Sequence, residues 1–332
     1  MKFAVFGAGR MGERHILNIA AHPRAELTYV VDPDEKRRTE IAARHGAVPC
    51  ADPEAALSDA SVDAVIIASA TNTHVDLIIA AARACKAILC EKPIDLDMGR
   101  VEACAAAIAH LQPRIMIGFQ RRFDPTHRAV RQAMIEGEIG SLEVLTIVSR
   151  DPSPPPAAYV AVSGGQFHDQ MIHDFDLALW LSNATGPVEL FAMASNLVDP
   201  AIGRLDDSDT AEVLMRFPNG AFCRIDCSRR AVYGYDQRVE AFGSQGMVSS
   251  GNLHRTAIKR YTATAAEVRT PLLGDFLQRY LPSYAAELDA FINAIEAGTP
   301  LDPDFESGWR ALRLADAARE SVRTGSKVVL TI

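Results

Sequence analysis

The sequence lacks any extended basic stretch. Its formal net charge is −8, with 34 Lys and Arg against 42 Asp and Glu. The one basic run, Lys36-Arg37-Arg38, is short and lies in a predicted helix, where a solvated face is the simplest interpretation. Surfaces that bind nucleic acid need clustered positive charge, so the composition argues against that class of partner.

Long apolar runs are also absent. No uninterrupted stretch reaches the ~18 residues that a membrane span requires. The segment Lys2-Phe3-Ala4-Val5-Phe6 runs directly into a glycine turn, which predicts a first strand and not a secretory signal. The six cysteines form no CxxC pair, which favours reduced thiols over disulfides or zinc. These absences predict a cytoplasmic protein that has no membrane partner.

What is present is an alternation of short apolar strands and helical stretches over residues 1–120. Strands are predicted at Phe3–Phe6, Leu27–Val31, Ala64–Ala68, Ile88–Cys90 and Ile115–Phe119, and helices at Met11–Ala21, Asp34–His45, His74–Ala84 and Met98–Leu111. Continuous apolar strands joined by helices indicate a parallel sheet covered on both faces. The sequence therefore predicts an α/β protein whose first domain, 1–120, is a doubly wound Rossmann fold.

The pattern changes after Phe119. Asn219-Gly220 and, later, Gly243-Ser244-Gln245-Gly246 each separate two strand-like runs and predict hairpins. Helices are predicted at Pro125–Glu136, His168–Leu181, Tyr284–Ala297 and Phe305–Thr324, and strands at Glu143–Ser149 and Val328–Ile332. Residues 121–332 are therefore expected to form an α+β domain with a large, mostly antiparallel open sheet and helices on one side. The stretch Leu253–Gln278 fits no regular element.

The first motif with chemical content is Gly7-x-Gly9-x-x-Gly12, between the first predicted strand and the first helix. Its glycines allow a tight turn and let the backbone approach a pyrophosphate at a helix N-terminus, where free N–H groups favour anions. Asp32 ends the next strand, 20 residues after Gly12. A carboxylate there accepts hydrogen bonds from both ribose hydroxyls and repels a 2′-phosphate. The motif predicts NAD as the cofactor, and Lys36-Arg37-Arg38 leaves NADP open.

Thr71-Asn72-Thr73-His74 follows the predicted strand Ala64–Ala68. A strand-to-helix turn with small polar residues is expected near the nicotinamide half of a dinucleotide. The simpler alternative is helix capping by Asn72 or Thr73, and both roles are compatible.

Glu91-Lys92-Pro93 follows the predicted strand Ile88–Cys90. Open α/β sheets bind ligands beyond the carboxyl ends of their strands, so Lys92 is expected at the cofactor site. A partly desolvated lysine there can shuttle a proton or donate to a developing alkoxide. The alternative is an ordinary surface lysine in a loop.

Asp169, His173, Asp176 and Trp180 lie at helical spacing and predict one polar face on a helix. An Asp one turn before a His can orient the imidazole and raise its proton affinity, which suits a general base. The alternative is a structural Asp and His. His168 and His173 are five residues apart, about 140° around a helix, so they do not form a metalloprotease pair. No metal site is predicted.

In this order, these residues resemble the Gfo/Idh/MocA family of oxidoreductases, and within it the inositol 2-dehydrogenase branch. The resemblance covers nearly the whole chain. It rests on Gly7–Gly12, Ala68–His74, Glu91-Lys92-Pro93-Ile94, Gly118–Asp124, Ser149–Pro152, Asp169–Asp176 and Ser228–Asp236.

The resemblance implies a Rossmann domain followed by a domain whose open sheet forms a homotetramer. It implies a catalytic Lys92, Asp169 and His173, drawn from both domains and acting on one carbinol beside the nicotinamide. It implies NAD contacts at Gly7, Gly9, Arg10, Met11, Gly12, Asp32, Ser69, Thr71, Asn72, His74, Glu91 and Lys92. It implies substrate contacts at Lys92, Gln120, Arg121, Asp169, Gln170, His173 and Tyr235.

Three residues depart from the family's common pattern: Gln120 replaces a methionine, Phe123 a tyrosine and Cys227 an asparagine. These changes bear on substrate selectivity. The resemblance implies NAD-dependent oxidation of myo-inositol to its 2-ketone (scyllo-inosose) in inositol catabolism. The alternatives are a dehydrogenase of another inositol isomer, sugar or inositol derivative, and an NAD-sensing regulator without turnover.

Overall fold

The computed structural model describes residues 1–330, which form two compact units. Unit 1 comprises Met1–Gln120 and Ser283–Leu312; unit 2 comprises Arg121–Pro282 and the described residues from Arg313 onward. Residues 283–312, which the sequence places in the second domain, therefore cluster with the first unit. Two helices, α10 (Phe276–Ala297) and α11 (Phe305–Thr324), contribute residues to both units.

Unit 1 is built on a six-stranded sheet with the order β3-β2-β1-β4-β5-β6, in which every paired strand runs parallel. Its strands are β1 (Lys2–Phe6), β2 (Glu26–Val31), β3 (Val48–Cys50), β4 (Ala64–Ile67), β5 (Ala87–Glu91) and β6 (Ile115–Gly118). The predicted Rossmann sheet is confirmed. The sequence missed only β3, whose three residues are too few to show a pattern.

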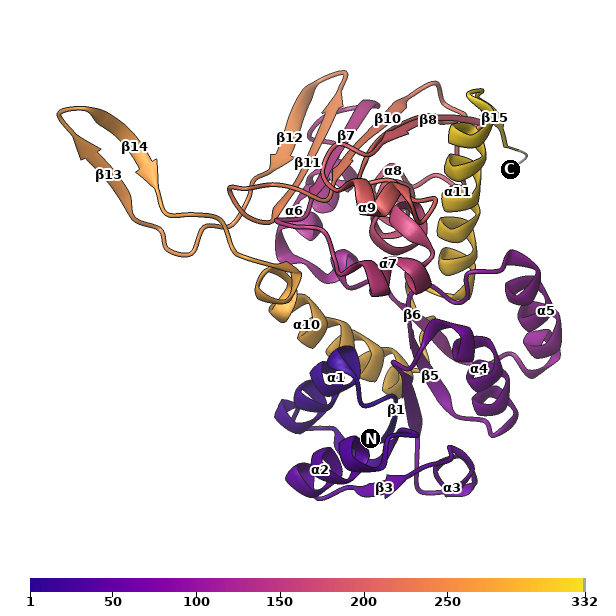
Figure 1. The fold of residues 1–332 in the computed structure, drawn as a ribbon. Helices are drawn as coiled ribbons and strands as arrows, with labels where there is room; N and C mark the ends of the chain where they lie inside the picture. The colour runs from indigo at the N-terminus through magenta and orange to yellow at the C-terminus, as the bar shows by residue number, and fades with distance from the viewer. Residues whose placement is uncertain (331–332) are drawn as a thin grey trace. The chain divides into compact units, whose positions relative to one another are not determined.

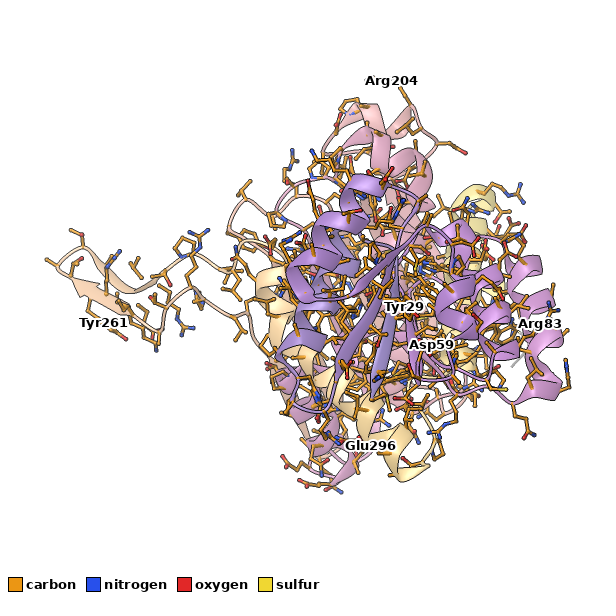
Figure 2. The ribbon with its side chains drawn as sticks, turned by 90° about the horizontal axis from the view of Figure 1, so that it is seen from below. Tyr29, Asp59, Arg83, Arg204, Tyr261 and Glu296 are labelled. Atoms are coloured by element: carbon orange, nitrogen blue, oxygen red, sulfur yellow. The ribbon has the colours of Figure 1, made fainter. Side chains whose placement is uncertain are left out.

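The helices of unit 1 cover both faces of its sheet. α1 (Arg10–Ala21) and α2 (Glu35–His45) lie on one side, and α4 (His74–Arg83) and α5 (Met98–Ile108) on the other (Figure 1). The strand order reverses at β1, so right-handed crossovers place the helices before the reversal on one face and those after it on the other. A short helix, α3 (Glu54–Ser58), precedes Asp59, whose carboxylate accepts a 2.9 Å hydrogen bond from the Tyr29 hydroxyl (Figure 2).

Unit 2 contains a seven-stranded sheet with the order β12-β11-β7-β10-β9-β8-β15. Its strands are β7 (Leu142–Arg150), β8 (Glu189–Ser195), β9 (Thr210–Arg216), β10 (Phe222–Ser228), β11 (Asp236–Gly243), β12 (Gly246–Ser250) and β15 (Val328–Val329). Only β7 and β10 pair in parallel. Both predicted hairpins, β9–β10 and β11–β12, are present. The end of the predicted strand Val328–Ile332, residues 331–332, lies outside the described residues.

Side chains along the strands of unit 2 alternate between buried and exposed, as in β9 and β10. The helices of the unit are α6 (Pro125–Ile135), α7 (Ala157–Ser163), α8 (Ile172–Ser182), α9 (Pro200–Gly203) and the C-terminal part of α11. They pack on one face, where Ser321 of α11 accepts a 2.9 Å hydrogen bond from the Ala192 N–H of β8. The other face carries exposed apolar side chains, so the sheet is open as predicted.

The stretch that fits no element in the sequence contains a separate hairpin of β13 (Lys259–Thr262) and β14 (Ala265–Arg269). Within residues 1–330, no helix combines the length and the apolar character needed to cross a membrane.

Candidate active site

The glycine turn of unit 1 is as tight as the sequence predicts. Gly7 has φ +98°, and a Cβ on it would lie 2.5 Å from the Ala68 carbonyl oxygen of the neighbouring strand end. A Cβ on Gly12 would lie 1.8 Å from the Gly7 carbonyl oxygen. Gly9 is different, because its Cβ would meet open space, and it precedes α1 without capping it by a side chain. Backbone N–H groups at this helix start can therefore face a pyrophosphate.

Asp32 lies where β2 ends and is 8% exposed. Its Oδ2 accepts the Ala8 N–H at 2.7 Å, and its Oδ1 accepts the Asp34 N–H at 2.9 Å. The carboxylate is thus fixed against the glycine turn, and each oxygen keeps a second lone pair for a ribose hydroxyl. The residues present fit the adenosine half of NAD.

The three side chains of the basic run Lys36-Arg37-Arg38 point to different surroundings. Lys36 is 84% exposed on its side chain and approaches Glu40. Arg38 turns back to donate to the carbonyls of Asp32 and Pro33, at 3.3 and 3.0 Å. Of the three, only Arg37 lines the cavity beside the turn.

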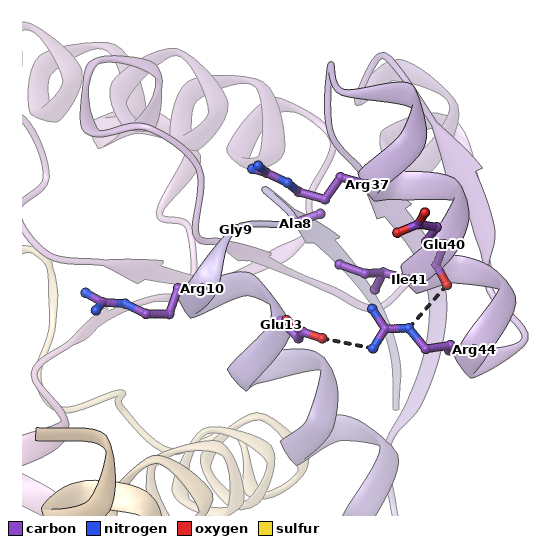
Figure 3. Close-up of a pocket in the computed structure, with 8 residues that line it drawn as sticks. All are labelled: Ala8, Gly9, Arg10, Glu13, Arg37, Glu40, Ile41 and Arg44. Carbon is purple, nitrogen blue, oxygen red and sulfur yellow. Dashed lines mark hydrogen bonds and ion pairs between the residues drawn. The ribbon is translucent and has the colours of Figure 1, made fainter. Parts of the chain in front are cut away.

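That cavity has a volume of about 310 Å³ and lies between α1 and α2 (Figure 3). Its lining residues are Ala8, Gly9, Arg10, Glu13, Arg37, Glu40, Ile41 and Arg44. Arg44 is fixed by Glu13, 3.0 Å away across the cavity. The arginines of this lining place positive charge beside the glycine turn. Because that charge would attract a 2′-phosphate, the preference for NAD over NADP depends on the Asp32 carboxylate.

The turn after β4 is held together by hydroxyl groups. Ser69 Oγ lies 2.7 Å from Thr73 Oγ1, which donates to the Ala70 carbonyl at 2.7 Å. Thr73 is the N-cap residue of α4, but its side chain makes no capping hydrogen bond, so side-chain capping by Thr73 is not observed. Ser69, Thr71 and Asn72 remain accessible along it, as a cofactor contact requires.

Both nitrogens of the buried His74 ring make hydrogen bonds, one of them to this turn. Its ring is only 1% exposed, with Nδ1 2.9 Å from the Pro93 carbonyl and Nε2 3.2 Å from the Ser69 carbonyl. Burial lowers the pKa of His74, and the two carbonyls oppose that effect. The ring thus links the β4 turn to Pro93, the residue after Lys92, and the expected contact of His74 with NAD stays a prediction.

Lys92 directly follows β5 and is half-buried. The preceding Glu91 points into unit 1, where its Oε1 lies 2.7 Å from Nε2 of the buried His15 of α1. A Cβ on Gly118 would come within 3.2 Å of Glu91 Oε2, so glycine leaves the room this carboxylate occupies. The Glu91 side chain therefore anchors the strand end that carries Lys92, and its expected contact with NAD stays a prediction.

Gln120 closes the first part of unit 1 and is 3% exposed. Its Oε1 has no hydrogen-bond partner among the described residues. A buried acceptor left without a donor costs about 1–3 kcal/mol. A polyhydroxylated ligand would supply that donor.

In unit 2, the predicted continuous helix from His168 to Leu181 is interrupted. Residues Gln166–Gln170 form a π-helical turn, and α8 begins at Ile172. Asp169 lies in the π turn and His173 in the first turn of α8. Such turns are frequent at functional sites.

Asp169 accepts a 2.9 Å hydrogen bond from the Tyr159 hydroxyl of α7. Tyr159 was not predicted as a site residue, because α7 is short and no sequence spacing relates it to Asp169. Gln170 donates from Nε2 to the Ser228 carbonyl at 3.3 Å, and its buried Oε1 has no partner among the described residues. His173 is buried nearby on the chain.

The other two members of the predicted polar face have structural roles. Asp176 is buried in a two-point ion pair with Arg122, at 2.9 Å to Nε and 2.5 Å to Nη2. The Trp180 ring lies under the Arg131 guanidinium, 4.6 Å away. Of the predicted polar face, only Asp169 and His173 therefore remain candidates for catalysis.

Arg121 and Tyr235, two of the expected substrate contacts, are buried in unit 2. Arg121 pairs with Asp174 at 2.5 Å and contacts Ser149 Oγ. Tyr235 packs edge-on against Tyr280 with centroids 6.1 Å apart, and burial raises its pKa well above the usual value. The contacts of Arg121 with Asp174 and of Tyr235 with Tyr280 were not predicted, because they depend on the tertiary fold.

Asp151 begins the proline-rich loop after β7. Burial raises the pKa of Asp151 to about 7; Arg121 opposes this effect, and the negative charge of Asp169 adds to it. Unit 2 thus contains a carboxyl group, Asp151, whose pKa lies near neutrality and is raised in part by the charge of Asp169. Among residues 1–330, no three His, Cys, Asp or Glu side chains are grouped to hold a metal ion.

Comparisons with known proteins match both parts of the chain. Residues 1–119 match the oxidoreductase family with an NAD-binding Rossmann fold, and residues 127–249 match the GFO/IDH/MocA C-terminal domain. The inositol 2-dehydrogenase of Rhizobium meliloti (strain 1021) is 44% identical over 97% of each chain.

Solved structures agree with these matches. A myo-inositol dehydrogenase from Corynebacterium glutamicum superposes with a TM-score of 0.96 at 41% identity, covering 100% of this chain and 99% of that one. A scyllo-inositol dehydrogenase from Lactobacillus casei, with bound NAD(H) and scyllo-inositol, has a TM-score of 0.91 at 26% identity, covering 99% and 98%.

Proposed function

This chain belongs to the Gfo/Idh/MocA family of oxidoreductases, and we propose that it oxidises position 2 of myo-inositol to the ketone in inositol catabolism. It is an NAD-dependent dehydrogenase of the inositol 2-dehydrogenase type. The observation that carries the substrate is the full-length similarity to inositol dehydrogenases at 40–44% identity. This enzyme class is favoured over the alternative of an NAD-sensing regulator without turnover.

In the proposed reaction, three side chains act on the carbinol. His173 removes the hydroxyl proton. Asp169 orients His173 and stabilises its charged form. Lys92 donates a hydrogen bond to the same oxygen as alkoxide character develops. Bound NAD supplies the acceptor for the hydride that leaves the carbinol carbon, so the products are the ketone, NADH and one proton.

Two features of the separate units support a polyol as the ligand. Gln120 in unit 1 and Gln170 in unit 2 each bury an amide oxygen that has no partner among the described residues. Asp151 and Tyr235 add further polar groups to unit 2. Each unpaired buried acceptor costs about 1–3 kcal/mol, which hydroxyl donors of a polyol would recover.

The alternative substrate is the scyllo isomer. A relative crystallised with scyllo-inositol shares this fold at 26% identity, whereas two relatives named for myo-inositol are 40% and 41% identical. The same proposal keeps NAD ahead of NADP because of Asp32. It also assigns the reaction to the cytoplasm, which agrees with six free cysteines.

We include in the proposal a homotetramer formed through the open face of the seven-stranded sheet. That face exposes the large apolar side chains Val144, Phe191, Met193, Leu214, Phe222, Phe242 and Met247. Contiguous exposed apolar surface of this kind commonly marks an interaction site.

The test of the function is NADH formation, followed by absorbance, with myo-inositol, scyllo-inositol, further inositol isomers and aldoses. We expect the highest kcat/KM with myo-inositol. A higher value with an aldose would contradict the proposal, and a higher value with scyllo-inositol would favour the alternative.

Lys92→Ala tests the chemistry. We expect kcat to fall by about 10²–10⁴-fold, the usual contribution of a positioned proton-transfer group, while NADH binding measured by fluorescence titration stays close to that of the parent. Arg83→Ala, an exposed change on α4, is the matched control. Retained turnover in Lys92→Ala would remove the lysine from the mechanism.

A further inference from the structure

Among residues 1–330, no segment covers either face of the hairpin β13–β14. Its two strands form a separate sheet, and each of their residues is exposed. Figure 1 shows the hairpin extending away from the seven-stranded sheet of unit 2. A two-stranded hairpin alone is marginally stable in water and gains stability when a face packs against something.

The hairpin carries side chains suited to a protein surface. On one face, Lys259 and Tyr261 both contact the Glu267 carboxylate, at 2.6 and 3.2 Å. Tyr261 is nevertheless 64% exposed (Figure 2). On the other face, Arg260 lies opposite Val268, so the apolar Val268 is also left open to solvent. Tyrosine and arginine are enriched in protein–protein interfaces.

The charge of the hairpin is opposite to that of the molecule. The segment 253–272 has four cationic side chains, Arg255, Lys259, Arg260 and Arg269, against the single carboxylate Glu267. Its net charge is +3, whereas the whole chain carries −8, so the remainder carries −11. The remainder of a second copy is therefore net acidic and the arm is net basic, and such opposite charge favours association.

The base of the hairpin is hydrogen-bonded to Tyr235, one of the expected substrate contacts. The Leu273 carbonyl accepts the Tyr235 N–H at 2.9 Å, and the Leu273 N–H donates to the Leu253 carbonyl at 3.1 Å. Gly234 has φ +123°, and a Cβ there would lie 2.6 Å from Leu272 Cβ. The C-terminal leg of the hairpin thus contacts Gly234 and Tyr235 directly, and the N-terminal leg is hydrogen-bonded to that leg at Leu253.

We propose that residues 253–272 form an arm that docks on a second copy of this chain, and that docking fixes Tyr235 of the arm's own chain. The arm is basic and partly apolar, and the remainder of each copy is net acidic. The base of the arm contacts Tyr235, which directly precedes β11. Assembly and substrate binding are then coupled through the hairpin base.

Photocrosslinking tests the docking. Tyr261 is replaced by p-benzoylphenylalanine in the full-length protein, with the same replacement at Ile135, an exposed position on α6, as control. We expect irradiation of the purified protein to give a covalent product of twice 36.0 kDa from the Tyr261 position. Lys259→Glu with Arg260→Glu, or high salt, should weaken it. A product formed only within one chain, or none at all, would overturn the proposal.

Removing the arm tests the coupling. Residues 257–268 are replaced by a short Gly-Ser turn, which keeps the base. We expect a smaller particle by analytical ultracentrifugation and a KM for inositol raised about tenfold, with the KM for NAD unchanged. An unchanged particle mass contradicts the docking. A smaller particle with unchanged KM contradicts only the link to Tyr235.

The KM readout rests on the proposed function, whereas the cross-link and the particle mass do not. If inositol is not the substrate, the parent protein itself shows no turnover with it. Failure of the proposed function is therefore distinguishable from failure of the arm.

Discussion

Glu287 is a fully buried carboxyl group in unit 1, with neither oxygen hydrogen-bonded among the described residues. Burial raises its pKa well above the usual value, and the nearby negative charge of Glu91 adds to the effect. Nothing in the sequence distinguishes Glu287 from the other acidic residues of a surface helix, because its burial depends on how α10 packs.

The raised pKa has a consequence for stability. The folded protein keeps the Glu287 proton at pH values where the unfolded chain, with a pKa near 4.5, has lost it. The native state thus binds more protons, so this group's contribution becomes less favourable as pH rises from about 4.5 through the folded pKa, by about 1.4 kcal/mol per pH unit.

We expect Glu287→Gln to remove this pH dependence. The gain in melting temperature over the parent should be small at pH 5 and grow towards pH 8. Thermal unfolding followed by circular dichroism across that range measures it, with the exposed Glu296→Gln on the same helix as control. A gain that does not grow with pH would show that Glu287 is already ionised in the native state.

Asp32 tests the cofactor assignment at the same scale. Asp32→Ala removes the acceptor for the ribose hydroxyls and the repulsion of a 2′-phosphate, while Arg37 and Arg44 remain at the cavity. We expect kcat/KM for NAD to fall by about 10-fold or more, and the preference over NADP to narrow or reverse. Steady-state kinetics with both cofactors decide it. An unaltered preference would exclude Asp32 as the determinant.

At the scale of elements, the sequence predicts helices and strands where periodicity is long and fails where packing decides. The limits of α11 are as predicted, and those of β1 and α6 differ by a residue. The π turn at Gln166–Gln170 was invisible, because its residues show the same apolar and polar spacing as the helix that follows. The hairpin β13–β14 was also missed, since exposed strands lack the buried alternation that marks a strand.

The predicted catalytic residues illustrate the same limit. Lys92, Asp169 and His173 could be selected by motif and resemblance, and Lys92 does follow a strand end of the Rossmann sheet. The residues that hold this region in place could not be selected from the sequence. They make hydrogen bonds between residues that no sequence spacing relates: His15 with Glu91, His74 with Pro93 and Tyr159 with Asp169.

The ion pair of Arg122 with Asp176 joins the segment before α6 to α8. Both partners are buried, so removing one leaves a charge without compensation, which costs about 3–5 kcal/mol. We expect Asp176→Asn to destabilise unit 2 strongly and Arg122→Met with Asp176→Leu to recover much of the loss. Urea denaturation measures both. Arg323→Ala, which breaks the exposed pair with Glu320, should leave the transition unchanged, and an equally small loss in Asp176→Asn would contradict the role of the pair.

At the scale of the whole molecule, the alternation of burial along unit 2 leaves one sheet face without helices. Leu214, near the middle of this face on β9, is 49% exposed. A monomer would keep these apolar side chains in water, whereas association through them removes about 25 cal/mol per Å² of unfavourable exposure.

Leu214→Glu should therefore disrupt the proposed tetramer, because it places a charge at the centre of an apolar contact and leaves the buried face of β9 untouched. We expect sedimentation velocity to show a smaller species with unchanged far-ultraviolet circular dichroism. Ile135→Glu adds the same charge at an exposed position on α6 and should keep the parent's mass. If Leu214→Glu sediments like the parent, assembly through the open sheet is wrong; if the arm-deleted protein alone dissociates, the hairpin and not the sheet holds the copies together.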